Sequence, residues 1–336
     1  MNVNLKDVAG RAGLSVATVS LALSGSDKVS KSTRQRVEKL AREMGYRPNL
    51  YARKLVTRRS RQIGLIVPDI ENVYYASLAQ RIFNDLTASG YGLMISTSMN
   101  SRLTERRIIC EMIENRVDAL MIAPVNTPNS DAGYLAMLDE AGIPLLFVTS
   151  AYPGADRPCV MCDLYGGMRS AVGALYAGGC RRMALVSGTE GVYSLDLRVA
   201  GYRDFLRENG IAYEQVYHLD NVRYEDAYAL IRGMDGPDAD AYICVNDMMA
   251  LGVVNALLER GVRVPEDVSV IGYDDVIFSA VSQVPITTVR QDIRRIAAEA
   301  VNRVLDMAQG NAHGRVSGCV LPCELIEKRS TRGRSQ

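Results

Sequence analysis

The first 26 residues alternate short apolar stripes with polar faces at the spacing of α-helices. In the stretch LKDVAGRAGLSVATVSLALSG, at 100° per residue, one stripe consists of Leu5, Val8, Ala9 and Ala12. Gly13 can adopt the left-handed conformation that ends this helix, and the Ser15 hydroxyl can cap the next one. The second helix has an inner side of Val19, Ala22 and Leu23, and an outer side of Val16, Ala17, Ser20 and Leu21. Two short helices joined by a tight turn are typical of a helix-turn-helix.

A third helix is predicted from the stretch SKSTRQRVEKLAREMGY, with Ser30 or Ser32 as its cap. Its inner stripe consists of Val37, Leu40, Ala41 and Met44. Three helices of this length can close a small core. The pattern alone also fits a helical bundle that binds nothing, so the charge of this region decides between the two interpretations.

Charge is divided unevenly between the start of the chain and the rest. Residues 1–62 hold 14 Lys and Arg against 4 Asp and Glu. Since the whole chain holds 39 and 38, the other 274 residues hold 25 and 34, and a basic head of net charge +10 precedes an acidic body of −9. A basic surface attracts a polyphosphate because condensed counterions are released on binding. The pattern and the charge together favour a DNA-binding head.

From residue 62 onward, short β-rich apolar runs alternate with helical stretches. The runs are QIGLIVPDI, YGLMISTSM, DALMIAPV, IPLLFVTS, RRMALVSG, DAYICVN and VSVIGYDD. This alternation predicts parallel sheets covered by helices, and the number of runs exceeds one modest sheet, so we expect two α/β lobes. Ligands bind beyond the carboxyl ends of strands in such sheets, which selects the segments PDIENVYY, VTSAY, VNDM and GYDD.

Composition and motifs exclude several classes of protein. No apolar run approaches the roughly 20 residues of a membrane helix, and MNVNLKDVAG lacks the form of a signal peptide, so we expect a cytoplasmic protein without membrane contact. The two histidines, His218 and His313, neighbour no nucleophile motif. The motifs GxSxG, GxxxxGK[ST], HExxH and GxGxxG are absent, so we expect no enzyme.

The seven cysteines are expected to be mostly thiols. The spacings Cys159-x-x-Cys162 and Cys319-x-x-x-Cys323 also occur in zinc sites. Cysteine is more often a small buried apolar residue, so we expect neither a metal nor a cofactor.

The chain resembles the LacI/GalR family of bacterial transcription factors over essentially its whole length. The resemblance rests on the motifs DVAGRAGLSVATVS, VSKSTRQRVEKLAREMGYRPN, ARKL, RVAGY, NDMMALG and VSVIGYDD, which occur in the family's order and spacing. It implies an all-α helix-turn-helix DNA-binding head over 1–46 and a hinge helix with linker over 47–61. The remainder, 62–336, is implied to be an α/β sensor like periplasmic binding proteins, dimeric and effector-binding. Its lobes are expected at about 62–160 with 292–320, and about 161–291 with 321–336.

The resemblance places the second helix of the head in the major groove of double-stranded DNA. The base-reading positions match Val16, Ala17 and Leu21. The third of these is often Arg in the family, so the operator sequence is expected to differ. Our hypothesis is that Val16 and Leu21 contact thymine methyls, while phosphates or base edges are bound by Ser15, Thr18 and Ser20.

The joint RPNLYARKLVTRRSRQ is basic, and Pro48 stops the helix before it. By resemblance it forms a short hinge helix that enters the minor groove, with Leu55 as a wedge beside Ala52 and Arg53. A helix this short is marginal in water, so it is expected to form only when two subunits and DNA support it.

In the sensor, three residues match family positions that bind the effector's polar groups: Arg198, Asn246 and Asp274. The loop after the first strand contributes Asp69, Asn72, Tyr74 and Tyr75. Arg with Asp can grip adjacent hydroxyls, which favours a sugar or sugar derivative. A capping or turn role is the alternative for each of these residues.

Two departures from the family pattern bear on the effector. A family Asp is Thr149 here, and an aromatic position matches Val222, for which Tyr224 can substitute. We therefore expect a homodimeric transcriptional regulator, most simply a repressor, with a small polar effector. The alternatives are a nucleobase- or nucleoside-responsive corepressor-type regulator and a solute-binding protein without DNA function. No heptad pattern supports a tetramer.

Overall fold

The computed structural model describes residues 3–23, 26–46, 60–128, 132–310 and 317–332, and its contacts divide the chain into Met1–Ser60 and Arg61–Gln336. The described part of the first unit holds three helices: α1 (Leu5–Ala12), α2 (Val16–Leu23) and α3 (Lys31–Glu43). Local chemistry fixes their ends, because Gly13 closes α1 in a left-handed conformation at φ 65° and the Ser30 hydroxyl accepts from the Thr33 amide at the start of α3.

The head closes a small core of its own. The three helices bury Val8, Ala9, Val19, Ala22, Val29, Val37 and Ala41. These include members of each inner stripe that the sequence predicts, while the other stripe residues lie partly buried around them. Arg36 also ties α3 to α1, since its Nη2 donates to the Ala12 carbonyl at 2.9 Å.

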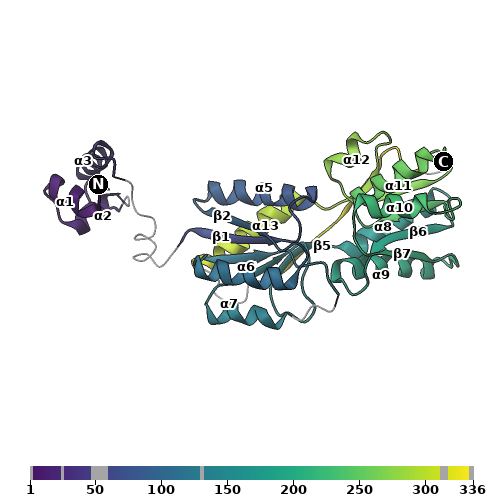
Figure 1. Cartoon of the computed structure of the whole chain (residues 1–336), viewed down its shortest axis with the longest axis horizontal. Helices are drawn as coiled ribbons and strands as arrows, with labels where there is room; N and C mark the ends of the chain where they lie inside the picture. The colour runs from purple at the N-terminus through teal and green to yellow at the C-terminus, as the bar shows by residue number, and fades with distance from the viewer. Residues whose placement is uncertain (1–2, 24–25, 47–59, 129–131, 311–316, 333–336) are drawn as a thin grey trace. The chain divides into compact units, whose positions relative to one another are not determined.

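The second unit contains two six-stranded sheets, each in its own lobe (Figure 1). In the first lobe the strand order is β11-β5-β4-β3-β1-β2, and every pairing is parallel. Its strands are β1 (Gln62–Val67), β2 (Gly92–Thr97), β3 (Ala119–Ile122), β4 (Leu145–Val148), β5 (Cys159–Cys162) and β11 (Cys319–Leu321). This arrangement is the parallel α/β architecture that the strand and helix repetition predicts.

Helices cover both faces of the first sheet (Figure 1). They are α5 (Val73–Ala88) and α13 (Ile293–Gln309) on one face, and α6 (Arg102–Glu114) and α7 (Ala136–Glu140) on the other; a short 3-10 turn, η1 (Gly133–Leu135), precedes α7. Side chains alternate along β1, so Leu65 packs in the core that includes Leu78 of α5, and Ile66 packs in the core that includes Ile109 of α6.

The second lobe repeats this plan with the strand order β12-β10-β9-β8-β6-β7, in which only β12 runs antiparallel to its neighbour. Its strands are β6 (Met183–Gly188), β7 (Gln215–Leu219), β8 (Ala241–Cys244), β9 (Ser269–Asp274), β10 (Thr287–Arg290) and β12 (Glu324–Ile326). Its helices are α8 (Leu164–Ala177), α9 (Tyr193–Glu208), α10 (Tyr224–Arg232), α11 (Asp247–Glu259) and α12 (Ile277–Val281).

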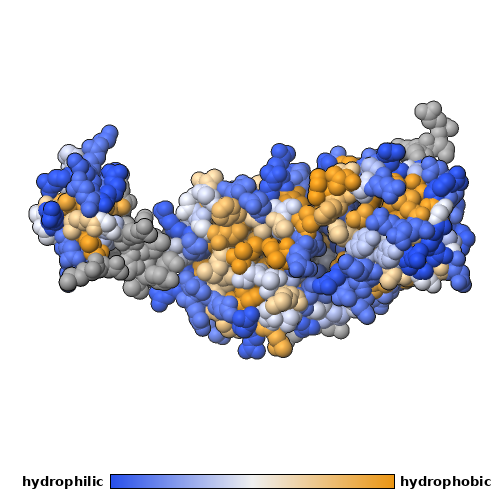
Figure 2. All heavy atoms as spheres, turned by 45° about the horizontal axis from the view of Figure 1, so that its top comes forward, coloured by the Kyte–Doolittle hydropathy of each residue, from blue (hydrophilic) through white to orange (hydrophobic). Residues whose placement is uncertain are grey.

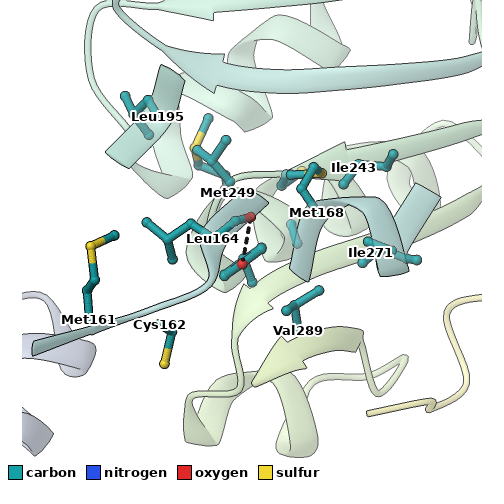
Figure 3. Packing of buried hydrophobic residues seen from close by; sticks show 14 of the residues in the cluster. Met161, Cys162, Leu164, Met168, Leu195, Ile243, Met249, Ile271 and Val289 are labelled. Carbon is teal, nitrogen blue, oxygen red and sulfur yellow. Dashed lines mark hydrogen bonds between the residues drawn. The ribbon is translucent and has the colours of Figure 1, made fainter. Parts of the chain in front are cut away.

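The chain passes between the lobes three times. It leaves the first sheet after Cys162 and enters α8, returns through Gln291 between β10 and α13, and leaves again through Cys323 between β11 and β12. Figure 3 shows the first of these crossings, with Met161 and Cys162 pointing to opposite sides of β5 ahead of Leu164. The three crossings place the carboxyl ends of both sheets near one another, which is where such folds bind ligands.

Candidate functional site

The outer side of α2 carries exposed apolar side chains. Val16 keeps 40% of its surface exposed and Leu21 keeps 36%, while Ala17 and Ser20 on the same side are also exposed. The inner residues Val19 and Ala22 are fully buried. The sequence pattern therefore separated the two sides of this helix correctly, and the side predicted to meet DNA is exposed.

The side-chain hydroxyls at the start of α2 hydrogen bond to each other. Ser15 Oγ lies 2.8 Å from Thr18 Oγ1 and accepts a hydrogen bond from the Thr18 amide at 3.1 Å. Ser15 is thus the cap that its position predicts; its side chain is exposed, and that of Thr18 is partly exposed. The predicted hinge residues Ala52, Arg53 and Leu55 lie outside the described residues.

In the second unit, an ion pair lies deep in a cavity lined by residues of both lobes. Arg198 of α9 and Asp274 at the end of β9 are 6% and 8% exposed, and Arg198 Nη2 lies 3.8 Å from Asp274 Oδ1. The Arg198 guanidinium also lies 4.2 Å from the centre of the Tyr273 ring and donates from Nη1 to the Ser194 carbonyl at 3.0 Å. These contacts fix the guanidinium plane beside the carboxylate.

Gln291 links this ion pair to the first lobe. Its Nε2 donates to Asp274 Oδ1 at 2.7 Å, and its Oε1 accepts from the hydroxyl of Tyr74, a residue of α5, at 3.2 Å. Sequence reasoning missed Gln291, because it lies in a crossing between a strand and a helix. The only signal available was the polar pair Gln291-Asp292 directly after the strand run TTVR.

Two buried polar atoms around this cavity find no hydrogen-bond partner within the described part of the chain: Arg198 Nε and Thr149 Oγ1. Thr149 follows β4 in a left-handed conformation, with φ at 67°. Burying such atoms without a partner costs about 1–3 kcal/mol each. A ligand that accepts from Arg198 and bonds to Thr149 recovers this cost, so the inner cavity is suited to a ligand with several polar groups.

Burial changes the acid–base properties of the inner cavity. Desolvation raises the pKa of Asp274 to about 6, although Arg198 and Gln291 act in the opposite direction. Burial also raises the pKa of Tyr74 and of Tyr75, whose rings meet edge to face at 5.4 Å. Both tyrosines therefore keep their hydroxyl protons at neutral pH.

Three of the predicted effector residues also have local structural roles. Asn72 caps α5 by accepting from the Tyr74 amide at 3.0 Å, and Asn246 caps α11 by accepting from the Met249 amide at 2.8 Å. Asp69 Oδ1 accepts from the Glu71 amide at 2.9 Å in a turn. Asn72 and Asn246 nonetheless line the inner cavity, and Asp69 lines a wider cavity beside it, so capping and ligand contact are compatible here.

A wider cavity of about 550 Å³ adjoins the inner one and shares Asn72, Tyr75, Asn126, Leu195, Val222 and Asn246 with it. Its lining carries four carboxylates: Asp69, Glu71, Asp220 and Glu225. Among the described residues of this lining, Arg223 supplies the only cationic side chain. The mouth of the site is therefore negatively charged.

Both departures from the family pattern fall at the effector cavity: Thr149 lines its inner part, while Val222 and Tyr224, at the aromatic position, line its wider part. Val222 lines both parts of it, and its carbonyl accepts from Asn246 Nδ2 at 2.8 Å. Tyr224 lines the wider part, but its ring stacks on Tyr228 at 5.8 Å and its hydroxyl accepts from Asn255 Nδ2 at 3.1 Å. Internal contacts thus hold Tyr224 in place at the rim.

The four cysteines of the two spaced motifs do not come together as one metal site. Cys319 is in register with Val160, and Leu321 with Cys162, so the two motifs run along neighbouring strands. Within the described part of the chain, no three His, Cys, Asp or Glu side chains come together as a metal site. Nor is any described helix both long and apolar enough to cross a membrane.

A helix-turn-helix head and a two-lobed α/β sensor with a polar interlobe cavity define the class of ligand-responsive DNA-binding proteins, and comparisons agree. Residues 4–49 match the lacI family of bacterial regulatory proteins, and residues 172–331 match the periplasmic binding protein-like domain. The chain is 33% identical to the HTH-type transcriptional repressor CytR of Escherichia coli K12, over 98% of this chain and 96% of that protein. It is 32% identical to the ribose operon repressor of Bacillus subtilis, over 98% of both.

A structure of the lac repressor dimer bound to operator and an anti-inducer superposes with a TM-score of 0.87, at 28% identity over 98% of this chain and 99% of that one. A CelR–cellobiose complex superposes with a TM-score of 0.73, at 29% identity over 98% of this chain and all of the other. The chain belongs to the lacI family of bacterial transcriptional regulators, which bind DNA and small-molecule effectors and are not enzymes.

Proposed function

We propose that this regulator is a homodimeric repressor whose operator affinity is controlled by an uncharged polyhydroxyl effector, a sugar or a compound containing one. The observation that carries the effector assignment is the pair of unpartnered buried atoms, Arg198 Nε and Thr149 Oγ1, around a cavity that already holds an ion pair. Relatives with the same fold include a ribose operon repressor and a CelR–cellobiose complex, which supports a sugar.

The charge of the cavity favours an uncharged ligand over a phosphate ester. Asp274 already balances Arg198 inside, and four carboxylates face one arginine in the wider cavity. A phosphate would lose its hydration next to these carboxylates without a free bidentate partner, whereas hydroxyls can both donate to Asp274 and accept from Arg198. Nucleosides remain within the class, because their ribose carries adjacent hydroxyls.

In the head, we infer that α2 reads base edges in the major groove. Val16 and Leu21 present exposed apolar surface suited to thymine methyls, and the small Ala17 allows close approach. Ser15, Thr18 and Ser20 lie on or near the same side and are available for phosphates or base edges. The unmatched positive charge of residues 1–62 supplies the salt-dependent part of the affinity.

The homodimer is supported by apolar side chains left exposed on both lobes, where Figure 2 shows hydrophobic residues gathered on the surface. In the first lobe these are Ile95, Met99 and Leu103; in the second they are Ile277, Phe278 and Val281. Met99 is 69% exposed, Leu103 81% and Val281 66%, so a second copy that covers these residues removes apolar surface from water. The lac repressor, which superposes well, is a dimer bound to its operator.

The experiment is a thermal-shift and operator-binding screen with matched pairs of compounds. D-ribose, cellobiose and cytidine are each tested beside a phosphate ester of the same compound. A ligand present at a hundred times its Kd stabilises the folded protein by about 2.7 kcal/mol, which is a rise of several degrees. We expect an uncharged member to raise the melting temperature and to change operator affinity. Tighter binding of a phosphate ester contradicts the charge argument, and salt-insensitive DNA binding contradicts the regulator assignment.

A further inference from the structure

Two cysteines that the effector site does not use lie at two of the three crossings between the lobes. Cys162 is the last residue of β5, directly before the chain enters α8, and Cys323 lies between β11 and β12. The two strands are parallel neighbours, with Leu321 in register with Cys162 and the Asp163 amide donating to the Leu321 carbonyl at 2.8 Å. Cys323 follows Leu321 by two residues, so alternation along an extended chain carries its side chain to the same side as that of Cys162.

The two thiols face the same side of neighbouring strands, and each influences the protonation of the other. A side-chain hydrogen bond between them is the largest influence on the pKa of each thiol, lowering that of Cys323 and raising that of Cys162. The backbone of Asp292, which belongs to the third crossing, acts in the opposite direction and lowers the pKa of Cys162 through hydrogen bonding. All three crossings therefore meet around this sulfur pair.

The surroundings favour Cys323 as the reactive member. Its Sγ lies 3.4 Å from the hydroxyl of Tyr273, and the Arg198 guanidinium stacks over that same ring at 4.2 Å. Both the Tyr273 hydrogen bond and the Arg198 charge favour the thiolate of Cys323 and lower its pKa. Cys323 is half-buried, whereas Cys162 is fully buried, so a small oxidant reaches Cys323 first.

We propose that Cys162 and Cys323 form a reversible, peroxide-sensitive dithiol whose disulfide ties two of the interlobe crossings together directly beneath the effector site. The Cys323 thiolate attacks one oxygen of hydrogen peroxide, the O–O bond breaks, and Cys323 becomes a sulfenic acid while the departing hydroxide takes a proton and forms water. The Cys162 sulfur then attacks the sulfenic sulfur, the S–S bond forms, and the hydroxyl leaves with the Cys162 proton as a second water. Two thiols and one peroxide thus give one disulfide and two waters.

The disulfide acts on the sensor because the backbone connections between the lobes run through these crossings. A bond between the β5–α8 crossing and the β11–β12 crossing restrains movement of one lobe against the other. It also fixes Cys323 next to the hydroxyl of Tyr273, the ring over which the Arg198 guanidinium stacks. Oxidation therefore changes the response to effector without altering a residue that contacts it.

The test uses the full-length reduced protein, graded hydrogen peroxide, and thiol-alkylation peptide mapping. Cys110 is exposed and serves as the internal reference. We expect a Cys162–Cys323 linked peptide to be the main product at peroxide levels that leave most Cys110 unmodified, and dithiothreitol to reverse it. Oxidation of Cys110 while Cys162 and Cys323 both stay reduced overturns the proposal, as does pairing of either with another cysteine.

Variants separate the two roles. C162S should stop at a sulfenic acid on Cys323 that dimedone traps, and C323S should leave the buried Cys162 unreacted. C159S and C319S lie on the same two strands and are the matched controls, which should leave the linkage unchanged. If a variant fails to fold, mapping of the unsubstituted protein still decides. Hydrogen exchange at 160–165 and 320–325 should slow several-fold on oxidation, and unchanged exchange there overturns the restraint.

Discussion

Replacing the buried carboxylate of the inner cavity should stabilise the protein without ligand. Asp274 is 8% exposed, and its pKa rises from the ordinary 3.8 to about 6, mainly through desolvation. The folded state therefore holds a proton between these values that the unfolded chain releases, so stability is lost as the pH rises from about 4 through 6. The difference between the two pKa values corresponds to a loss of folding stability of at most about 3 kcal/mol above pH 7.

The variant D274N cannot ionise and keeps an oxygen that can accept from Gln291. We expect its free energy of unfolding to exceed that of the unsubstituted protein by about 1 kcal/mol at pH 4.5 and about 3 kcal/mol at pH 7.5. Urea denaturation at these two pH values measures the difference. The same variant should bind effector more weakly, because a hydroxyl that donates to Asp274 loses its charged acceptor.

The neighbouring Asp275 is the matched control. Its carboxylate pairs with Lys328 Nζ at 2.7 Å and with Arg290 Nε at 2.8 Å. Asp274 and Asp275 both have positive φ, which Asn tolerates. D275N should therefore lose about 1–3 kcal/mol at pH 7.5, opposite in sign to D274N. A D274N protein that is less stable at pH 7.5 than the unsubstituted one, or a difference independent of pH, refutes the reasoning.

Three further substitutions test the head, the hinge and the lobe junction. L21R should change the base preferred at one position of the sites selected from a randomised duplex library, because Arg can hydrogen bond to guanine. The discrimination between bases at that position should be about 1–3 kcal/mol. Unchanged selection means that residue 21 reads no base. L55A should reduce operator affinity far more than effector affinity, and comparable losses argue against a hinge wedge. G167A should lower the free energy of unfolding, measured by urea denaturation, by about 1–3 kcal/mol. The reason is that its Cβ would lie 2.3 Å from the Tyr273 hydroxyl oxygen and 2.9 Å from Cys323 Cβ. G173A on the same helix meets only the Phe205 ring, at 3.3 Å, and should cost less; equal losses contradict the steric explanation.

The sequence by itself determined the features that depend on local interactions. The ends of α1 and α3 follow from Gly13 and Ser30, because a left-handed glycine and a capping hydroxyl act within a few residues. The parallel sheets follow from apolar runs alternating with helices, because strands buried on both faces need continuous apolar sequence. The effector roles of Arg198 and Asp274 were predicted from the resemblance, through motifs that occur in the family's order, and they stay predictions.

Only the tertiary structure decided how the site works. Gln291 hydrogen bonds to Tyr74 across 217 positions of sequence and also to Asp274, and no local pattern encodes the contact with Tyr74. The raised pKa of Asp274 and the unpartnered Arg198 Nε depend on how much water the packed lobes exclude, which composition does not specify. In the same way, Cys162 and Cys323 become partners because two distant strands pair side by side, and hydrogen bonding between strands sets that register.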